Sequence, residues 1–76
     1  MNNRYSLNTV LLNQQADQTR LGVKLGKKCI KLGVPVAIIA VRLGVSRQTV
    51  YNWFIGAYDP KPELTIDIKN LIKTLK

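Results

Sequence analysis

The feature that most constrains the fold is a pair of short helical patterns separated by a glycine, in residues 36–56. Read with 3.6 residues per turn, this segment predicts an apolar helix, a tight turn at Gly44 and a second helix with two unlike faces. Gly44 suits the reversal because glycine readily adopts a positive φ. Ser46 is a good N-cap for the second helix, since its hydroxyl can accept a backbone N–H. The apolar residues expected to meet between the two helices are Ile39, Ala40, Leu43, Val50, Trp53 and Phe54.

The second helix, predicted over residues 47–55, has a polar face opposite the apolar one. Arg47 lies at its leading edge, and the outward residues are Gln48, Tyr51, Asn52 and Ile55. Arg, Gln and Asn side chains carry donors and acceptors that match base edges in the major groove of DNA. This layout is typical of a helix-turn-helix whose second helix reads DNA.

The sequence AVRLGVSRQTVYNWFIG resembles the lambda-repressor/Cro family, especially the LGVS-R-x-TV-x-x-W-x-x-G signature common in phage and bacterial regulators. The resemblance covers residues 32–56 well and the flanks loosely. It implies an all-α fold, a small lambda-repressor-like helix-turn-helix bundle of four to five helices. It also implies a homodimer on a palindromic DNA site, with half-sites about 34 Å apart. The family residues that match Arg47, Gln48, Tyr51 and Asn52 lie in the major groove.

Each predicted DNA contact has a plainer alternative, a solvated surface residue. Arg47 is predicted to reach a guanine edge or a phosphate, and Gln48 and Asn52 to pair with adenine. Tyr51 is predicted to touch a thymine methyl group or a phosphate. Contacts with the DNA backbone are predicted for two further residues, Thr49 and Arg42.

Two departures from the family lie around the first helix of the pair. Relatives have Ser or Thr followed by Gln where this chain has Pro35 and Val36. Val36 cannot make the phosphate hydrogen bond of that Gln, whereas Pro35 suits the first helical position. Ile38 and Val41 are apolar where relatives tend to be polar, and exposed they would form an apolar ridge. We expect the N-terminal segment to cover this ridge, with a partner subunit as the alternative.

Size and charge favour one small domain with a polyanionic partner. The 76 residues carry a net charge of +8, and seven Lys or Arg but no acid lie between Asp17 and Asp59. The positive charge is thus concentrated in the part of the sequence that holds the helix-turn-helix, as DNA binding requires. A chain this short is marginally stable alone, so DNA or a partner chain would help.

The sequence predicts an N-terminal segment, residues 1–16, that is either an arm or a short packing segment, followed by a helix-turn-helix DNA-binding domain, residues 17–76. The N-terminal segment is either a short helix or strand packed on the core, or an arm in which Arg4 contacts DNA or a second subunit. Asp17 is predicted to cap a helix from about residue 18 to residue 32. The lysine face of that helix, either solvated or in contact with phosphate, consists of Lys24, Lys27, Lys28 and Lys31.

A last helix is predicted after the proline-rich loop, starting near Pro62 or Glu63 and running almost to the end. Ile66 lies opposite its apolar stripe, either as a plain surface residue or as a dimer contact. The stripe consists of Leu64, Ile68, Leu71, Ile72 and Leu75.

The composition argues against an enzyme, a cofactor or a small-molecule substrate. The chain has no His, the usual acid–base residue near neutral pH, and its four acids are not paired within a motif. One Cys without His cannot build a structural zinc site within one chain. Cys29 lies on the apolar arc of its helix and is expected to be a buried small hydrophobe.

The leading hypothesis is a cytoplasmic, sequence-specific regulator of transcription that binds double-stranded DNA, such as a Cro-like phage repressor. A single cysteine, no signal peptide and no apolar run long enough to span a bilayer support that location. One alternative is a helix-turn-helix-shaped protein-binding module, such as a phage-encoded inhibitor of a host enzyme, acting through Ile38 and Val41. Another is sequence-blind packaging of nucleic acid or binding at a membrane surface, which the lysine-rich faces would support.

Overall fold

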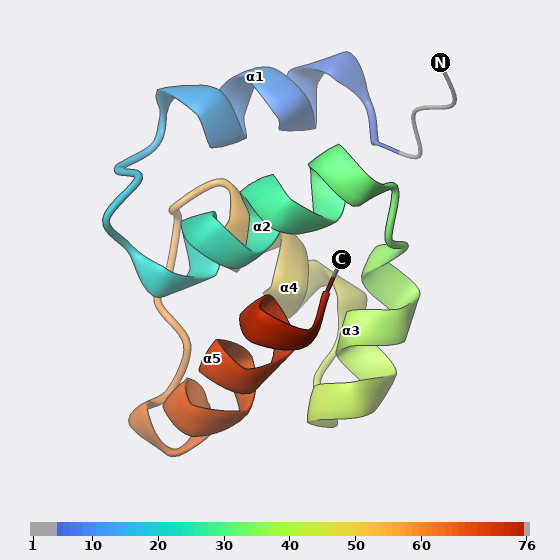
Figure 1. Cartoon of the computed structure of the whole chain (residues 1–76). Coiled ribbons are helices and arrows are strands. Elements are labelled where there is room, and N and C mark those ends of the chain that lie inside the picture. Colours follow the sequence, from blue (N-terminus) through green and yellow to red (C-terminus); the bar gives the residue numbers. More distant parts are fainter. Residues whose placement is uncertain (1–4, 76) are drawn as a thin grey trace.

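The computed structural model of the chain describes residues 5–75, which form five α-helices and one short 3-10 helix without any strand (Figure 1). The predicted all-α class and the small helical bundle are therefore confirmed. Arg4, and with it the predicted arm contact, lies outside the described residues. The helices are α1 (Leu7–Gln15), α2 (Leu21–Leu32), α3 (Val36–Leu43), α4 (Arg47–Phe54), the 3-10 helix η1 (Pro62–Leu64) and α5 (Thr65–Thr74).

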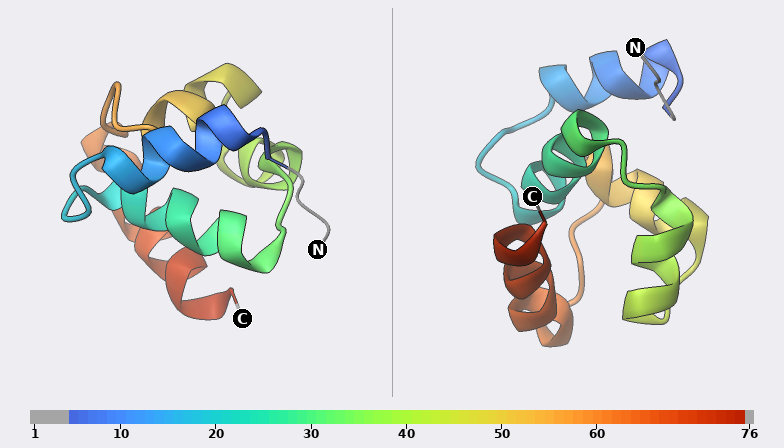
Figure 2. Two further views of the ribbon diagram at one scale, coloured as in Figure 1. Left: turned by 90° about the horizontal axis from the view of Figure 1, so that it is seen from above. Right: turned by 45° about the vertical axis from the view of Figure 1, so that its right-hand side comes forward.

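The central helix is α2, against which α1, α4 and α5 pack from different sides (Figure 2). Two of its glycines let α4 approach unusually closely. A Cβ atom added at Gly22 would lie 2.7 Å from Cβ of Trp53, and one added at Gly26 would lie 2.7 Å from Cγ of Phe54. The C-terminal half of α4 therefore packs directly against the face of α2 that carries these glycines.

The core lies between α2, α3, α4 and α5. Its largest fully buried side chains are Phe54, Leu25, Ile39, Ile68, Val23, Val50 and Cys29. Trp53 is almost as deeply buried, with 3% of its surface exposed. The apolar faces predicted for α3 and α4 therefore meet as the periodicity indicates, except that Leu43 is only partly buried.

The turn between α3 and α4 forms as predicted. Gly44 has φ of 68°, in the left-handed region that favours glycine. The N–H of Val45 donates to the carbonyl of Ala40 at 3.0 Å, which closes the end of α3. The Ser46 hydroxyl accepts the N–H of Thr49 at 3.1 Å and caps α4. Local chemistry alone thus fixes where α3 ends and α4 begins.

The predicted start of α2 was wrong by three residues. The helix begins at Leu21 with Arg20 as its N-cap, and no side chain caps it. Asp17 instead accepts hydrogen bonds from the hydroxyl and the N–H of Thr19, at 2.6 and 2.9 Å, which lowers the pKa of its carboxyl group. This local turn competes with helix formation, because the Asp side chain satisfies the backbone before a helix can start. A smaller shift occurs at α3, where Pro35 is the N-cap and not the first helical residue.

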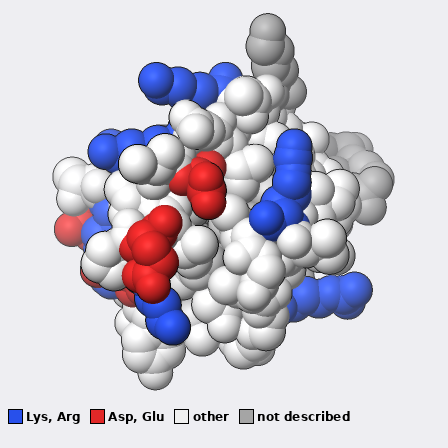
Figure 3. Space-filling model, turned by 90° about the horizontal axis from the view of Figure 1, so that it is seen from below, with Lys and Arg blue, Asp and Glu red and all other residues white. Residues whose placement is uncertain are grey.

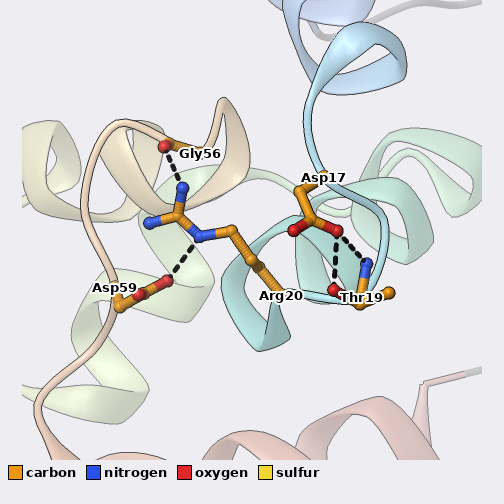
Figure 4. A network of polar contacts seen from close by, with 5 residues as sticks. All are labelled: Asp17, Thr19, Arg20, Gly56 and Asp59. Carbon is orange, nitrogen blue, oxygen red and sulfur yellow. Dashed lines mark hydrogen bonds and ion pairs between the residues drawn. The ribbon is translucent and has the colours of Figure 1, made fainter.

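Arg20 connects the start of α2 to the loop that follows α4 (Figure 4). Its Nε donates to Oδ1 of Asp59 at 2.8 Å, and its Nη1 donates to the carbonyl of Gly56 at 2.6 Å. The bond to Asp59 raises the pKa of the guanidinium group. This contact holds the loop of residues 55–61 against α2 and so leads the chain from α4 towards α5.

Two side chains of the N-terminal segment anchor α1 to the bundle. Asn13 is buried, and its Nδ2 donates to the carbonyls of Val23 and Phe54 at 3.2 and 2.6 Å. Tyr5 is also buried, and its hydroxyl donates to the carbonyl of Val34. Both anchors direct α1 towards α2 and α4.

The expectation that the N-terminal segment covers the apolar ridge of α3 was wrong for the part of it that the structure describes. Ile38 remains 51% exposed and Val41 83% exposed. The reason is that α1 packs against α2 and α4, at the opposite end of the molecule from the C-terminal end of α3 (Figures 1 and 2). At the other end of the chain, η1 precedes α5, and Ile68 is the residue of the predicted stripe that is fully buried.

Candidate nucleic-acid interface

The face of α4 that points away from the core carries five of the six residues predicted to contact DNA. Arg47 and Gln48 are exposed, while Thr49, Tyr51 and Asn52 are half-buried. The face is fixed in direction because Val50, Trp53 and Phe54 are buried on the opposite side. We call these five outward residues, Arg47, Gln48, Thr49, Tyr51 and Asn52, the polar face of α4. The sixth residue, Arg42, is exposed near the end of α3.

Gln48 and Asn52 are joined by a hydrogen bond, in which Nε2 of Gln48 donates to Oδ1 of Asn52 at 3.1 Å. The bond uses one of the two hydrogens on Nε2, so the other hydrogen and Oε1 of Gln48 remain able to pair with a base. Pairing with adenine requires one donor and one acceptor of the same amide. Gln48 meets this requirement while bonded, and Asn52 holds its amide in place.

The ring of Tyr51 is less accessible to a partner than the sequence indicates. Its ring meets the buried ring of Tyr5 edge-on, with centroids 6.3 Å apart and planes at 78°. Only part of the Tyr51 side chain is therefore available to a partner. The contact joins residues 46 positions apart, and no local pattern in the sequence predicts it.

A hollow of about 350 Å³ separates the polar face of α4 from α1. On the α4 side it is lined by Gln48, Tyr51 and Ile55, and on the α1 side by Ser6, Asn8, Thr9 and Leu12. The polar residues of α1 beside this face are candidates that sequence reasoning did not single out. One signal for them was available, because Ser6 caps α1 by accepting the N–H of Thr9 at 3.1 Å, as a Ser before an apolar run predicts.

The basic residues are divided between two sides of the molecule. Gly22 and Gly26 of α2 face α4, so residues about half a turn away on the helix face the opposite side. These are the four lysines of the predicted lysine face, which contribute no charge next to α4. The end of the molecule where α3 ends and α5 begins has mixed charge, with acidic side chains gathered on one half of this face and basic ones on both halves (Figure 3). Among the described residues, Arg47 belongs to the polar face of α4, and Arg42 lies near the end of the preceding helix.

The described part of the chain offers no metal-binding cluster, and its cysteine is not activated. Cys29 is fully buried, and burial raises the pKa of its thiol to about 12, so the thiolate that a nucleophile needs is scarce at neutral pH. Residues 5–75 contain no cluster of three or more His, Cys, Asp or Glu side chains that could hold a metal ion. In the same residues, no helix is long and apolar enough to cross a membrane.

Comparison with known proteins adds no relative to this description. None of the protein-family models, curated proteins or solved structures compared with the chain gives a significant match.

Proposed function

We propose that this protein is a regulator of transcription that binds double-stranded DNA in a sequence-specific manner, with α4 in the major groove. The observation that carries the proposal is the orientation of α4. Arg47 and Gln48 are open to solvent, whereas Trp53, on the opposite side of the same helix, is 3% exposed. A short capped helix that presents Arg and Gln outward next to a glycine turn is what major-groove readout by a helix-turn-helix requires.

Each residue of the site has a definite role in this proposal. Gln48, oriented by Asn52, pairs with an adenine, and Arg47 contacts a guanine edge or a phosphate. Thr49 and Arg42 contact phosphates and fix the position of the helix on the duplex. Tyr51 adds a smaller contact, because Tyr5 covers part of its ring.

The wider proposal follows from the resemblance to the lambda-repressor/Cro family. The protein would act as a homodimer on a palindromic site and repress transcription by occupying a promoter. It would work in the cytoplasm of its host cell without a cofactor or a catalytic activity. Selection of bound sites from random duplex DNA tests this directly, because a dimer is expected to select a symmetric motif, and selection of no motif would contradict the proposal.

We expect Arg47→Ala to weaken binding to the selected site by about 1–3 kcal/mol and to relax the base preference at one position. A titration of wild type and variant with the selected duplex and with single-base changes measures both effects. Lys61→Ala is the matched control, because Lys61 is an exposed cation in the loop before η1. If Arg47→Ala binds with unchanged affinity and unchanged preference, Arg47 does not read DNA.

A second candidate function, a protein-binding module, is favoured by the exposure of Ile38 and Val41 on α3. A ridge of this kind is a usual mark of a protein contact. If it is the functional surface, the protein captures one partner stoichiometrically and binds DNA weakly without preference. The double variant Ile38→Ser/Val41→Ser would then lose the partner and keep its helical circular dichroism spectrum. If this variant still captures the partner and still binds DNA as the wild type does, the ridge is not the functional surface.

A further inference from the structure

A second surface, on the side of α2 away from α4, is formed by α2 and α5. Two adjoining hollows of about 380 Å³ each lie there, and they share Lys24 and Ile72 as lining residues. We call this continuous hollow the α2–α5 groove. Figures 1 and 2 show α5 and α4 on different sides of α2, so the groove is separate from the polar face of α4.

The groove is strongly basic. Among the described residues, no acid lines it and six lysines do, namely Lys24, Lys27, Lys28, Lys31, Lys69 and Lys73. The four acids of the chain lie elsewhere. Asp17 is bonded to Thr19, Asp59 is paired with Arg20, Glu63 belongs to η1, and Asp67 lines a hollow on the other flank of α5 together with Arg42. The lysines therefore have no neutralising partner within the groove.

Part of the lining of the groove is apolar. This part consists of Leu21 and Ile72, both half-buried, and Ile66, which is 73% exposed. Phosphates of DNA or RNA would pair with the lysines but would leave these apolar side chains uncovered. A ligand that carries both apolar and negatively charged side chains would satisfy both parts of the surface.

We propose that the α2–α5 groove binds an acidic amphipathic helix of another protein. Lys24, Lys28 and Lys31 follow one another at helical spacing along α2, over about 10 Å at 1.5 Å per residue. Lys69 and Lys73 form a second row, one turn apart, along α5. A partner helix has the same rise per residue, so acidic residues three or four positions apart match these rows. Its apolar stripe then covers Ile66 and Ile72, as in other helix-in-groove contacts.

The test uses a fluorescent helical peptide with Leu at helical spacing on one face and Glu beside that face, titrated with the full-length protein. We expect Ile66→Ser to weaken binding about tenfold, because burial of an isoleucine contributes at least about 1.5 kcal/mol. The double variant Lys69→Gln/Lys73→Gln is expected to weaken binding similarly and to reduce its dependence on salt. Lys61→Gln, a lysine outside the groove, is expected to bind as the wild type does, and so is Arg47→Ala.

The same titrations with a random-sequence DNA duplex and with phosphatidylserine vesicles separate a protein partner from other polyanions. The proposal fails if the peptide does not bind. It also fails if Ile66→Ser binds the peptide as tightly as the wild type. It fails as well if the wild type binds the duplex or the vesicles more tightly than the peptide, and if only Lys69→Gln/Lys73→Gln, and not Ile66→Ser, weakens that binding. Ile66→Ser keeps the charge of the protein and lies away from α4, so it is expected to bind a DNA site selected by the wild type as tightly as the wild type does if α4 reads DNA. This measurement separates a failure of the groove proposal from a failure of the DNA proposal.

Discussion

Replacement of Phe54 by alanine is expected to lower the free energy of unfolding by about 3–5 kcal/mol, the usual cost of removing a buried aromatic ring. Phe54 is fully buried, and its ring lies against Gly26 of α2 and near the ring of Tyr5, with centroids 6.1 Å apart. The ring therefore joins α4 to α2 and to the N-terminal segment at once. At about 0.05–0.15 kcal/mol per residue, a domain of this size has roughly 4–11 kcal/mol of stability in total, so the variant is expected to lose a large fraction of it.

Urea unfolding followed by circular dichroism measures this loss. Tyr58→Ala is the matched control, because Tyr58 is an aromatic residue only four positions away but 66% exposed. It is expected to change the stability by no more than about 0.5 kcal/mol. A Phe54→Ala variant as stable as the Tyr58→Ala variant would mean that α4 is not seated on α2 as described.

Replacement of Gly26 by alanine is expected to destabilise the protein by about 1–3 kcal/mol, although alanine favours helices over glycine. The new Cβ would lie 2.7 Å from Cγ of Phe54 and 2.8 Å from Nδ2 of Asn13. Neither neighbour can easily move, since Phe54 fills the core and Asn13 is held by hydrogen bonds to two carbonyls. The gain in helix propensity, about 1 kcal/mol, is therefore smaller than the cost of separating α2 from α4 and α1.

A double-mutant cycle identifies the contact that is responsible. Combined with Phe54→Ala, which removes the Cγ atom that the new Cβ would meet at 2.7 Å, Gly26→Ala is expected to cost clearly less than it does alone. Lys27→Ala, at the neighbouring exposed position, is the control and is expected to leave the stability within about 0.5 kcal/mol. Additive effects of the two substitutions in the cycle would contradict a clash between these residues.

The pair α3 and α4 could be predicted from the sequence because its determinants are local. The spacing of Val50, Trp53 and Phe54 marks one face, Gly44 supplies the positive φ, and Ser46 supplies the cap. The same local reasoning failed at Asp17. Its carboxylate could either cap a helix or accept hydrogen bonds from Thr19 in a turn, and the structure has the turn. Periodicity identifies the faces of helices well, but it does not decide between alternative hydrogen bonds of one side chain.

The position of the N-terminal segment could not be predicted, because long-range contacts set it. Asn13 bonds to the carbonyl of Phe54, 41 residues away, and Tyr5 bonds to that of Val34, 29 residues away. No short pattern in the sequence encodes such partners. For this reason the sequence predicted the outward direction of Arg47 and Gln48, but not the partly covered ring of Tyr51 or the polar residues of α1 beside it.

Few buried side chains hold α1 to the bundle, and this affects which part of the protein unfolds locally. Within α1 only Asn13 is buried and Val10 is partly buried, while Leu7, Leu11 and Leu12 are exposed, so detaching this helix uncovers less apolar surface than opening the core does. Amide hydrogen exchange in α1 should therefore proceed through a local opening that leaves α2 protected, at a free energy well below that of global unfolding. When the opening also releases Tyr5, the Tyr51 ring loses its cover, and more of α4 becomes accessible to a ligand.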